Sequence, residues 1–399
     1  MADKVNQNSP NGIDDFKISI TAVGGDTYDI TSAVGEISLY ESIYFPYIHG
    51  AIGVSDVSMM LSDFPFVGQE KLKVKWKRDD QEFDREFYIT KVSNVTSEDG
   101  GKGRYELTVT SEVQVKNSVS LFSKAYSDKG DKIISNVFSE QLGTELSVMD
   151  GAAAKTSHSV VFPYLKPLQA VNMVQKSVLG DDDTPIFIYD VLYEDEVRLD
   201  TFGRMIAREP IMDIEYFKPS NEDEQGQAYR SLADNRGIIH TDSISRAYNT
   251  YDALNRGSFA SKVTLTDPST SHYEPLEFDY ESHAPALGSK DFVSSDYTVD
   301  GSSVTELFDT ENKHTLKNSR AFNDEFPNLN TIDDYDNAIH QSYTRRHAVT
   351  VVQLYMDGIA YTPKKDKPFC VGQTVNYNMN RFKPNLSADE DTLDKVNSG

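Results

Sequence analysis

The N-terminal part of this chain alternates apolar and polar side chains with a period of two residues. The clearest run covers residues 71–77, where Leu72, Val74 and Trp76 alternate with lysines. Successive side chains of a strand point to opposite faces, so such a run predicts a strand with one buried and one solvated face. Shorter runs separated by glycine-rich turns repeat the pattern, which predicts an antiparallel β-barrel over residues 13–118.

The period changes in the next part of the chain. Residues 128–142 place apolar side chains at helical spacing and are followed by Gly143, which predicts an amphipathic helix with a glycine cap. Residues 167–179 predict a second helix, which ends at Gly180. Strand-like segments follow these helices. We therefore predict a mixed α/β domain over residues 119–213.

Strand patterns return in the C-terminal half. Residues 214–283 and 331–399 predict a second barrel that contains a short helix over 332–346. The intervening residues 284–330 are polar and without clear period, and they are too many for an ordinary connection, so they predict a surface insertion. A polar tail is expected from residue 383 onward. The predicted fold class is α+β, mainly β: two β-barrels with an intervening α/β domain and a long loop insertion.

The sequence contains neither the short apolar segment of a secretory signal nor the long apolar segment of a membrane-spanning helix. The first fifteen residues contain no apolar stretch of the kind found in secretory signals, and residues 1–12 are predicted to form a mobile polar arm. A docking arm that folds on a partner is the alternative. The sequence has no apolar run of about 18 residues, so no membrane-spanning helix is predicted.

The net charge limits the classes of partner. Thirty-nine Lys and Arg against 63 Asp and Glu give a charge of −24 at pH 7. Phosphate groups need a basic surface, so tight binding to nucleic acid or to an anionic membrane is disfavoured. The 22 Tyr and 20 Phe are too many for a disordered acidic chain. A single cysteine, Cys370, excludes an intramolecular disulfide and cysteine-rich metal sites, and it is interpreted as a packed thiol.

Catalytic and cofactor motifs are absent from the sequence. There is no His-Glu-x-x-His pair, phosphate-binding loop or Gly-x-Ser-x-Gly element, and no two of the eight histidines are three or four residues apart. The run Asp181-Asp182-Asp183 is interpreted as a solvated turn in preference to a cation site. We therefore predict no catalytic residue, no metal and no cofactor. With 63 acidic residues, paired carboxylates for glycan hydrolysis stay an alternative that the sequence does not test.

The first candidate interface is a row of lysines on one face of a predicted strand, formed by Lys71, Lys73, Lys75 and Lys77. One interpretation is that these lysines protect an exposed edge strand against unwanted pairing. The other interpretation is a contact with an acidic surface of a partner or of another subunit.

The second candidate interface is an apolar loop that contains Met59, Met60, Phe64 and Phe66. Two interpretations are open for this loop. It either forms a short element that plugs the end of the barrel, which we favour, or presents an exposed contact.

Around this loop the sequence resembles a known family. The resemblance to baseplate central hub proteins of T-even-type contractile-tailed bacteriophages depends on several segments in the same order along the chain. They are Gly50–Asp56, Leu61, Phe64–Leu72, Asn255–Lys262, Asp267, Phe278–Tyr280, Arg345-Arg346 before Ala348–Met356, and Phe369–Val375.

The resemblance implies an architecture and a role. Such hubs carry two barrels similar to tail-tube subunits, and three chains form a ring of six barrels that adapts the six-fold tail tube to the three-fold central spike. The implied partners are two further copies of the chain, the spike protein, the tail tube protein and neighbouring baseplate wedge proteins. DNA would pass through the axial channel without being held. The implied location is the baseplate of the virion tail, assembled in the host cytoplasm.

The acidic composition fits such a channel, because like charge on the lumen would keep phosphates from adhering. General solubility is the alternative explanation. Two other functions stay open at this point: the hub of a phage-derived contractile injection system, and a polysaccharide-acting enzyme built on β-domains.

The resemblance also predicts that the second barrel is incomplete. In similar hubs at least one further hairpin follows the strand that begins near Val371, whereas residues 381–399 are polar. Open sheet edges are normally covered. We therefore expect that the natural chain continues past Gly399 or that another segment supplies the missing strands.

Overall fold

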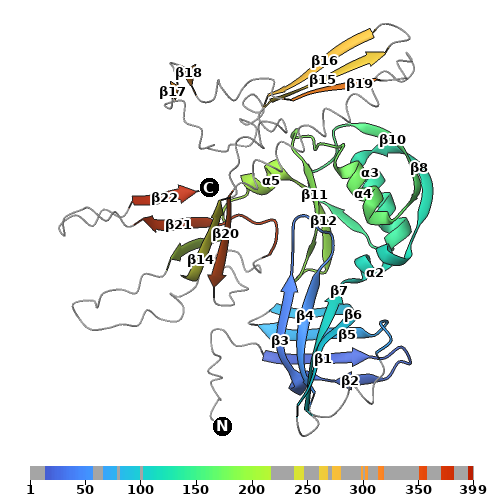
Figure 1. The fold of residues 1–399 in the computed structure, drawn as a ribbon, viewed down its shortest axis with the longest axis vertical. Coiled ribbons are helices and arrows are strands. Elements are labelled where there is room, and N and C mark those ends of the chain that lie inside the picture. The colour runs from blue at the N-terminus through green and yellow to red at the C-terminus, as the bar shows by residue number, and fades with distance from the viewer. Residues whose placement is uncertain are drawn as a thin grey trace, which may run out of the picture.

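A computed structural model of the protein shows a mainly β architecture with a few helices in the middle of the chain (Figure 1). The predicted arm 1–12 and the predicted helix over 332–346 lie outside the residues that the structure describes. The described residues are 14–56, 66–78, 81–98, 102–216, 238–246, 260–267, 272–279, 298–299, 302–303, 313–318, 350–356, 370–381 and 394–398.

Among the described residues, the N-terminal part forms one seven-stranded antiparallel sheet, here called the first sheet. Its strand order is β2-β1-β5-β6-β7-β4-β3, and a short 3₁₀ helix, η1 (Thr31–Ala33), precedes β3. The strands are β1 (Asp14–Thr21), β2 (Thr27–Asp29), β3 (Val34–Tyr40), β4 (His49–Asp56), β5 (Lys71–Arg78), β6 (Gln81–Glu98) and β7 (Lys102–Thr110).

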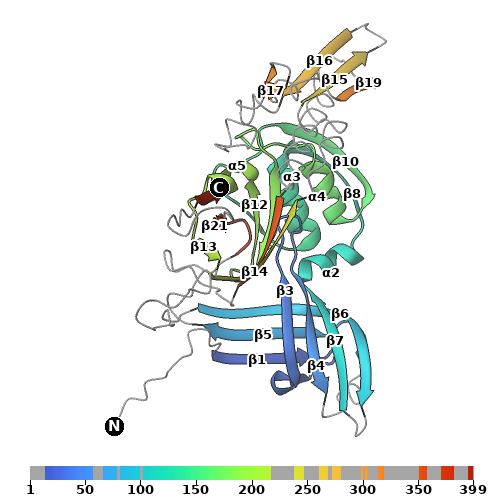
Figure 2. The same cartoon turned by 60° about the vertical axis from the view of Figure 1, so that its left-hand side comes forward.

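The first sheet is strongly curled. β6 has 18 residues, and its pairing register with β7 shifts twice, between Ile89 and Lys91 and between Ser93 and Thr96. Such bulges increase bending and twist, so β1 and β5 lie across β3 and β4 (Figure 2). Within the described strands, β2 and β3 are the two edges and do not pair with each other. The antiparallel pairing of the predicted barrel is confirmed, but the described strands curl only as a half-barrel, so a closed barrel stays a prediction.

The period-two pattern correctly predicts most of the core of this sheet. Ile18, Leu72 and Val74 are fully buried, as the alternation requires. Lys91 is an exception, because the sequence pattern places it on the same face as Ile89. The bulge at this point turns Lys91 outward, and Val92 packs against the core in its place.

The middle of the chain combines short strands with helices, most of which pack on one core. The elements are α2 (Glu112–Val119), β8 (Phe122–Lys129), α3 (Gly130–Val137), a π-helical turn η2 (Phe138–Leu142), β9 (Leu146–Val148), β10 (Ser157–Leu165), α4 (Pro167–Gln175), β11 (Ile186–Val191), β12 (Glu196–Thr201) and α5 (Phe202–Ala207). β8 pairs with β10, and β11 pairs with β12, which pairs in parallel with β9.

Both predicted helices are present, with altered ends. Residues 130–142 form α3 and η2, and Gly143 ends them in the left-handed conformation (φ 59°) that glycine adopts without strain. The residues immediately before Gly130 belong to β8. Gly130 lies so close to Val178 that a Cβ atom would be 2.6 Å from a methyl carbon of that side chain. α4 ends at Gln175, five residues before the predicted Gly180.

The described elements after residue 212 are all strands, but they do not form a purely antiparallel barrel. One five-stranded sheet has the order β20-β14-β13-β21-β22, and one three-stranded sheet has the order β16-β15-β19. The strands are β13 (Asp213–Tyr216), β14 (Ile238–Arg246), β15 (Ala260–Asp267), β16 (His272–Asp279), β17 (Thr298–Val299), β18 (Ser302–Ser303), β19 (Lys313–Asn318), β20 (Thr350–Met356), β21 (Asn376–Arg381) and β22 (Asp394–Ser398).

The prediction of an antiparallel second barrel is therefore wrong in its pairing. β13 pairs in parallel with both β14 and β21, and β15 pairs in parallel with β19. Parallel pairs connect strands that are distant in sequence, so the local alternation does not reveal them.

Two segments predicted to be irregular contain strands. Residues 313–318 belong to the predicted insertion and form β19, which joins the sheet of β15 and β16. Residues 394–398 belong to the predicted polar tail and form β22, which pairs with β21. Both strands are mostly polar, so their backbone pairing has no signature in the hydrophobic pattern.

Candidate functional site

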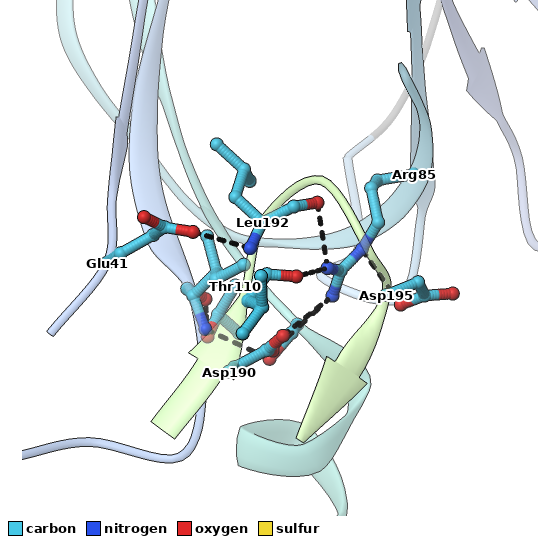
Figure 3. Close-up of polar contacts among 9 residues, drawn as sticks. Glu41, Arg85, Thr110, Asp190, Leu192 and Asp195 are labelled. Carbon is cyan, nitrogen blue, oxygen red and sulfur yellow. Dashed lines mark hydrogen bonds and ion pairs between the residues drawn. The ribbon is translucent and has the colours of Figure 1, made fainter. Parts of the chain in front are cut away.

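The structure brings together a largely buried group of charged side chains where the first sheet meets the hairpin of β11 and β12. We call this group the junction, defined by Glu41, Arg85, Asp190 and Asp195 (Figure 3). Glu41 follows β3, Arg85 comes from β6, and the two aspartates come from the hairpin. Among the described residues, no cluster of His, Cys, Asp and Glu has the geometry of a metal site.

Arg85 points into the core of the first sheet instead of into solvent. It lies opposite Val74 on β5 and is only 6% exposed. Its Nη1 donates to the backbone oxygens of Val191 (2.9 Å) and Leu192 (3.1 Å). Its Nη2 lies 3.2 Å from a carboxylate oxygen of Asp190.

The Nε atom of Arg85 also has a partner in the hairpin. Its Nε lies 2.8 Å from a carboxylate oxygen of Asp195, which is 75% exposed in the hairpin turn. A planar guanidinium presents its donors in a fixed fork, and here they face two carboxylates and two carbonyls of one hairpin. The direct partners of the Arg85 guanidinium are therefore residues that are more than 100 positions away in the sequence.

Burial changes the protonation equilibria of the two acids deepest in the junction. Desolvation raises the pKa of Asp190 to about 6, and the attraction of Arg85 opposes this shift without cancelling it. Desolvation also raises the pKa of Glu41, against the hydrogen bonds that its carboxylate accepts.

Glu41 connects three parts of the chain. One of its carboxylate oxygens accepts a hydrogen bond from the backbone N–H of Leu192 at 2.5 Å, and the other accepts from the N–H of Val371 at 3.0 Å. The loop after β3, the hairpin tip and the segment before β21 therefore meet at a single carboxylate.

A second buried ion cluster lies at the other end of the hairpin. Asp200 on β12 is fully buried and forms ion pairs with Arg204 and Arg208. Nη1 of Arg208 donates to the backbone oxygen of Gly372. Gly372 has φ 78° and lies against the ring of Tyr189, where a Cβ atom would be 2.8 Å from the hydroxyl oxygen, so only glycine fits.

The contact between Gly372 and Tyr189 gives a structural reason for the sequence motif around Cys370. Cys370 is buried in a small cluster with Phe187 and Tyr189, as its interpretation as a packed thiol predicts. The backbone oxygen of Arg208 accepts a hydrogen bond from the hydroxyl of Thr374. The segment 370–376 is thus held to residues 208–212 by backbone and side-chain hydrogen bonds, and it packs against Tyr189 of the hairpin, so the motif serves packing.

The junction and the second ion cluster bind and orient chain segments, and their geometry suits that role. Both carboxylate oxygens of Glu41, Asp190 and Asp200 already face partners within the protein. Asp182 behaves similarly: its carboxylate accepts hydrogen bonds from the backbone N–H and hydroxyl of Thr184 and from the hydroxyl of Thr201. The Asp181–Asp183 run is therefore a hydrogen-bonded turn.

The predicted lysine row lies on the outer face of the first sheet. Lys71 and Lys73 form ion pairs with Glu86 (2.5 Å) and Asp84 (3.0 Å), and Lys75 pairs with Glu82, all across to β6. β5 lies between β1 and β6, so the interpretation of these lysines as protection of an edge strand is wrong. The sequence pattern did not reveal the acidic row opposite. A partner contact at Lys71, Lys73, Lys75 and Lys77 stays a prediction.

The structure places one residue of the predicted apolar loop. Phe66 packs against the core of the first sheet, with its ring centroid 6.1 Å from that of Tyr105. It also lines an open pocket of about 420 Å³ together with Glu70 and Ile89. Met59, Met60 and Phe64 lie outside the described residues.

Glu70 fixes the chain after this loop, and the sequence pattern gave no indication of that role. Its side chain is buried, and its carboxylate accepts hydrogen bonds from the backbone N–H groups of Val67, Gly68 and Gln69 at 2.6, 2.9 and 3.1 Å. An acid directly after a glycine-containing turn is the signal that could have identified it.

Comparisons with known proteins find similarity of structure. No protein-family model and no curated protein matches the sequence. The 43 kDa tail protein of prophage MuSo2 from Shewanella oneidensis aligns with a TM-score of 0.50 and 8% identity, covering 90% of this chain and 88% of that chain. The tail protein from Neisseria meningitidis MC58 aligns with a TM-score of 0.49 and 12% identity, covering 91% and 86%.

At 8% identity, this chain and the 43 kDa prophage tail protein share their fold. The similarity extends over nine tenths of both proteins, so it includes the first sheet, the middle elements and the C-terminal strands. The mainly β fold with a curled antiparallel sheet is thus the fold of a phage tail protein.

Proposed function

We propose that this protein is a structural component of a phage tail baseplate, in which three copies form a hub. The observation that supports this proposal most strongly is the shared fold with the 43 kDa prophage tail protein over nine tenths of the chain. The sequence resemblance to T-even-type baseplate hubs supports the same role independently, because it depends on local segments and not on the fold.

The proposed role is geometric. A chain with two tube-like β regions presents six such regions when three copies form a ring, which matches a six-fold tail tube on one side and a three-fold spike on the other. The spike, the tube protein and the wedge proteins are the proposed partners. The protein carries no catalytic function in this proposal, and DNA only passes through the channel.

The charge of the chain supports transit without retention. Each copy carries −24, so a ring of three carries three times that charge. DNA would meet a surface of like charge. Such a surface releases no counterions from the phosphates, so it gains no binding free energy from contact with DNA. The same ring would serve a contractile injection system, which differs in what it transfers.

Native mass spectrometry and light scattering of the full chain test the proposal. We expect particles of three times 44.8 kDa, with an axial channel in electron micrographs. Because like charges oppose assembly and salt screens them, the trimer fraction should rise between 50 and about 500 mM NaCl.

Two results would contradict the proposed hub. A monomer at every salt concentration, both alone and mixed with a candidate spike, would remove the ring on which the geometry depends. Turnover of a bacterial polysaccharide by the purified chain would favour the enzyme alternative.

A further inference from the structure

The core of the first sheet includes residues that do not belong to that sheet. Leu192 and Tyr193 form the tip of the β11–β12 hairpin, and both pack against the buried cluster of the first sheet. Trp76 and Phe83 stack with their ring centroids 3.7 Å apart, and the ring of Tyr193 stands edge-on to both, at 6.3 and 5.6 Å. Edge-to-face aromatic groups of this kind add specific geometry to the burial of apolar area.

The inward-facing charge of Arg85 also shows that the core of the first sheet depends on the hairpin. Arg85 occupies a core position between Phe83 and Phe87 on β6, where the pattern calls for an apolar residue. A buried charge without partners is very unfavourable. Every partner that we describe for its guanidinium comes from residues 190–195, so a first sheet without the hairpin would carry an uncompensated charge in its core.

The hairpin is itself anchored at its other end. Asp200 and Arg208 hold the segment at Gly372, and Glu41 joins that segment to the hairpin tip. The tip is therefore presented to the first sheet on a supported strand pair and not on a free loop.

We propose that the tip of the β11–β12 hairpin is a plug that completes the core of the first sheet, so that the first sheet and the middle elements unfold together and keep one fixed mutual orientation. The plug is defined by residues 190–195. This inference rests on the contacts within the chain and is independent of the proposed hub function. Its consequence is that the angle between the two regions is set before any partner binds.

Trp76 makes the plug measurable, because it is the single tryptophan of the chain and touches Tyr193. In the 399-residue chain we compare Tyr193→Ala with Tyr193→Phe, which keeps the ring. We expect Tyr193→Ala to shift the Trp76 emission to longer wavelength and to raise its acrylamide quenching constant severalfold. Tyr193→Phe should stay close to the wild type in both measurements.

Unchanged Trp76 emission and quenching in a folded Tyr193→Ala variant would overturn the proposal. A measurement on the wild type covers the case in which that variant does not fold. In hydrogen exchange followed by mass spectrometry, peptides that contain residues 190–195 and peptides from β6 should open together under mildly destabilising conditions. Exchange of the tip through separate openings, with β6 still protected, would also overturn it.

Discussion

The two faces of the β5–β6 strand pair both carry ion pairs, which are exposed to solvent on one face and buried on the other. On the outer face, Lys73 and Asp84 form an ion pair with side chains that are 51% and 37% exposed. On the inner face, Arg85 and Asp190 form one with side chains that are 6% and 3% exposed. The outer charges form a repeating row that is visible in the sequence, whereas the inner charge is a single residue in an apolar pattern.

The difference in exposure between the two ion pairs indicates which charges stabilise the fold. Exposed ion pairs lose most of their attraction to solvent screening and side-chain entropy. A buried pair has already lost its hydration, so the loss of one partner leaves a charge that neither water nor protein stabilises. We therefore expect the inconspicuous Arg85 to matter far more for stability than the conspicuous lysine row.

Arg85→Met tests the inner face and should have the largest effect. The substitution keeps an unbranched apolar side chain but leaves Asp190 without its counter-charge. We expect a loss of about 3–5 kcal/mol in the free energy of unfolding at pH 8, as for other broken buried pairs. Denaturant titration followed by Trp76 fluorescence measures it. A loss below about 1 kcal/mol would mean that solvent reaches Asp190 and that the two faces do not differ.

The pH dependence of Asp190 also tests the inner face, and its expected effect is smaller. Its pKa is about 6 in the folded protein, against 3.8 as its ordinary value. Between these two pH values, Asp190 is protonated in the folded state and ionised in the unfolded chain. Protonation of Asp190 therefore stabilises the folded state. This stabilisation is complete below pH 3.8 and is lost as the pH rises through 6. The shift corresponds to at most about 3 kcal/mol.

The Asp190→Asn variant removes this titration and serves as the reference. The Tm of the wild type minus that of Asp190→Asn should fall as the pH rises from 4 to 7 and should then level off. Glu41 is present in both proteins, so its own titration largely cancels. If the difference instead grew with rising pH, attraction by Arg85 would outweigh desolvation.

Lys73→Met tests the outer face and should have the smallest effect. It makes the same kind of replacement as Arg85→Met, on the neighbouring strand of the same pair. We expect a change of less than about 0.5 kcal/mol, as for most surface substitutions. The same denaturant titration measures it, and high salt should reduce the change further. A loss comparable to that of Arg85→Met would show that the lysine row has a structural role that its exposure does not explain.

Local pattern was sufficient to identify several strands of the first sheet and the helices α3 and α4. Period-two alternation identified Leu72 and Val74 as core residues, and the structure buries both completely. Gly143 correctly marked the end of a helix. These features depend on neighbours in the sequence, through side-chain direction and backbone conformation.

Long-range pairing could not be predicted in this way. β19 and β22 are mostly polar strands, and their hydrogen-bonding partners are determined by the fold around them. The bulge in β6 moved Lys91 outward by adding a residue to one strand, which no alternation records. The edge-strand interpretation of the lysines failed because strand order is a property of the whole sheet.

The amino-acid pattern alone identifies an acidic, mainly β chain with two strand-rich parts around a helical part. The sequence also has Arg85 between Phe83 and Phe87, but the local pattern did not identify it as a buried charge. Tertiary structure alone decided that the partner is the β11–β12 hairpin, because Asp190 and the carbonyls at 191 and 192 reach Arg85 only through the packing of the two regions. The physical reason is that burial, and not sequence distance, sets the cost of leaving a charge unpaired.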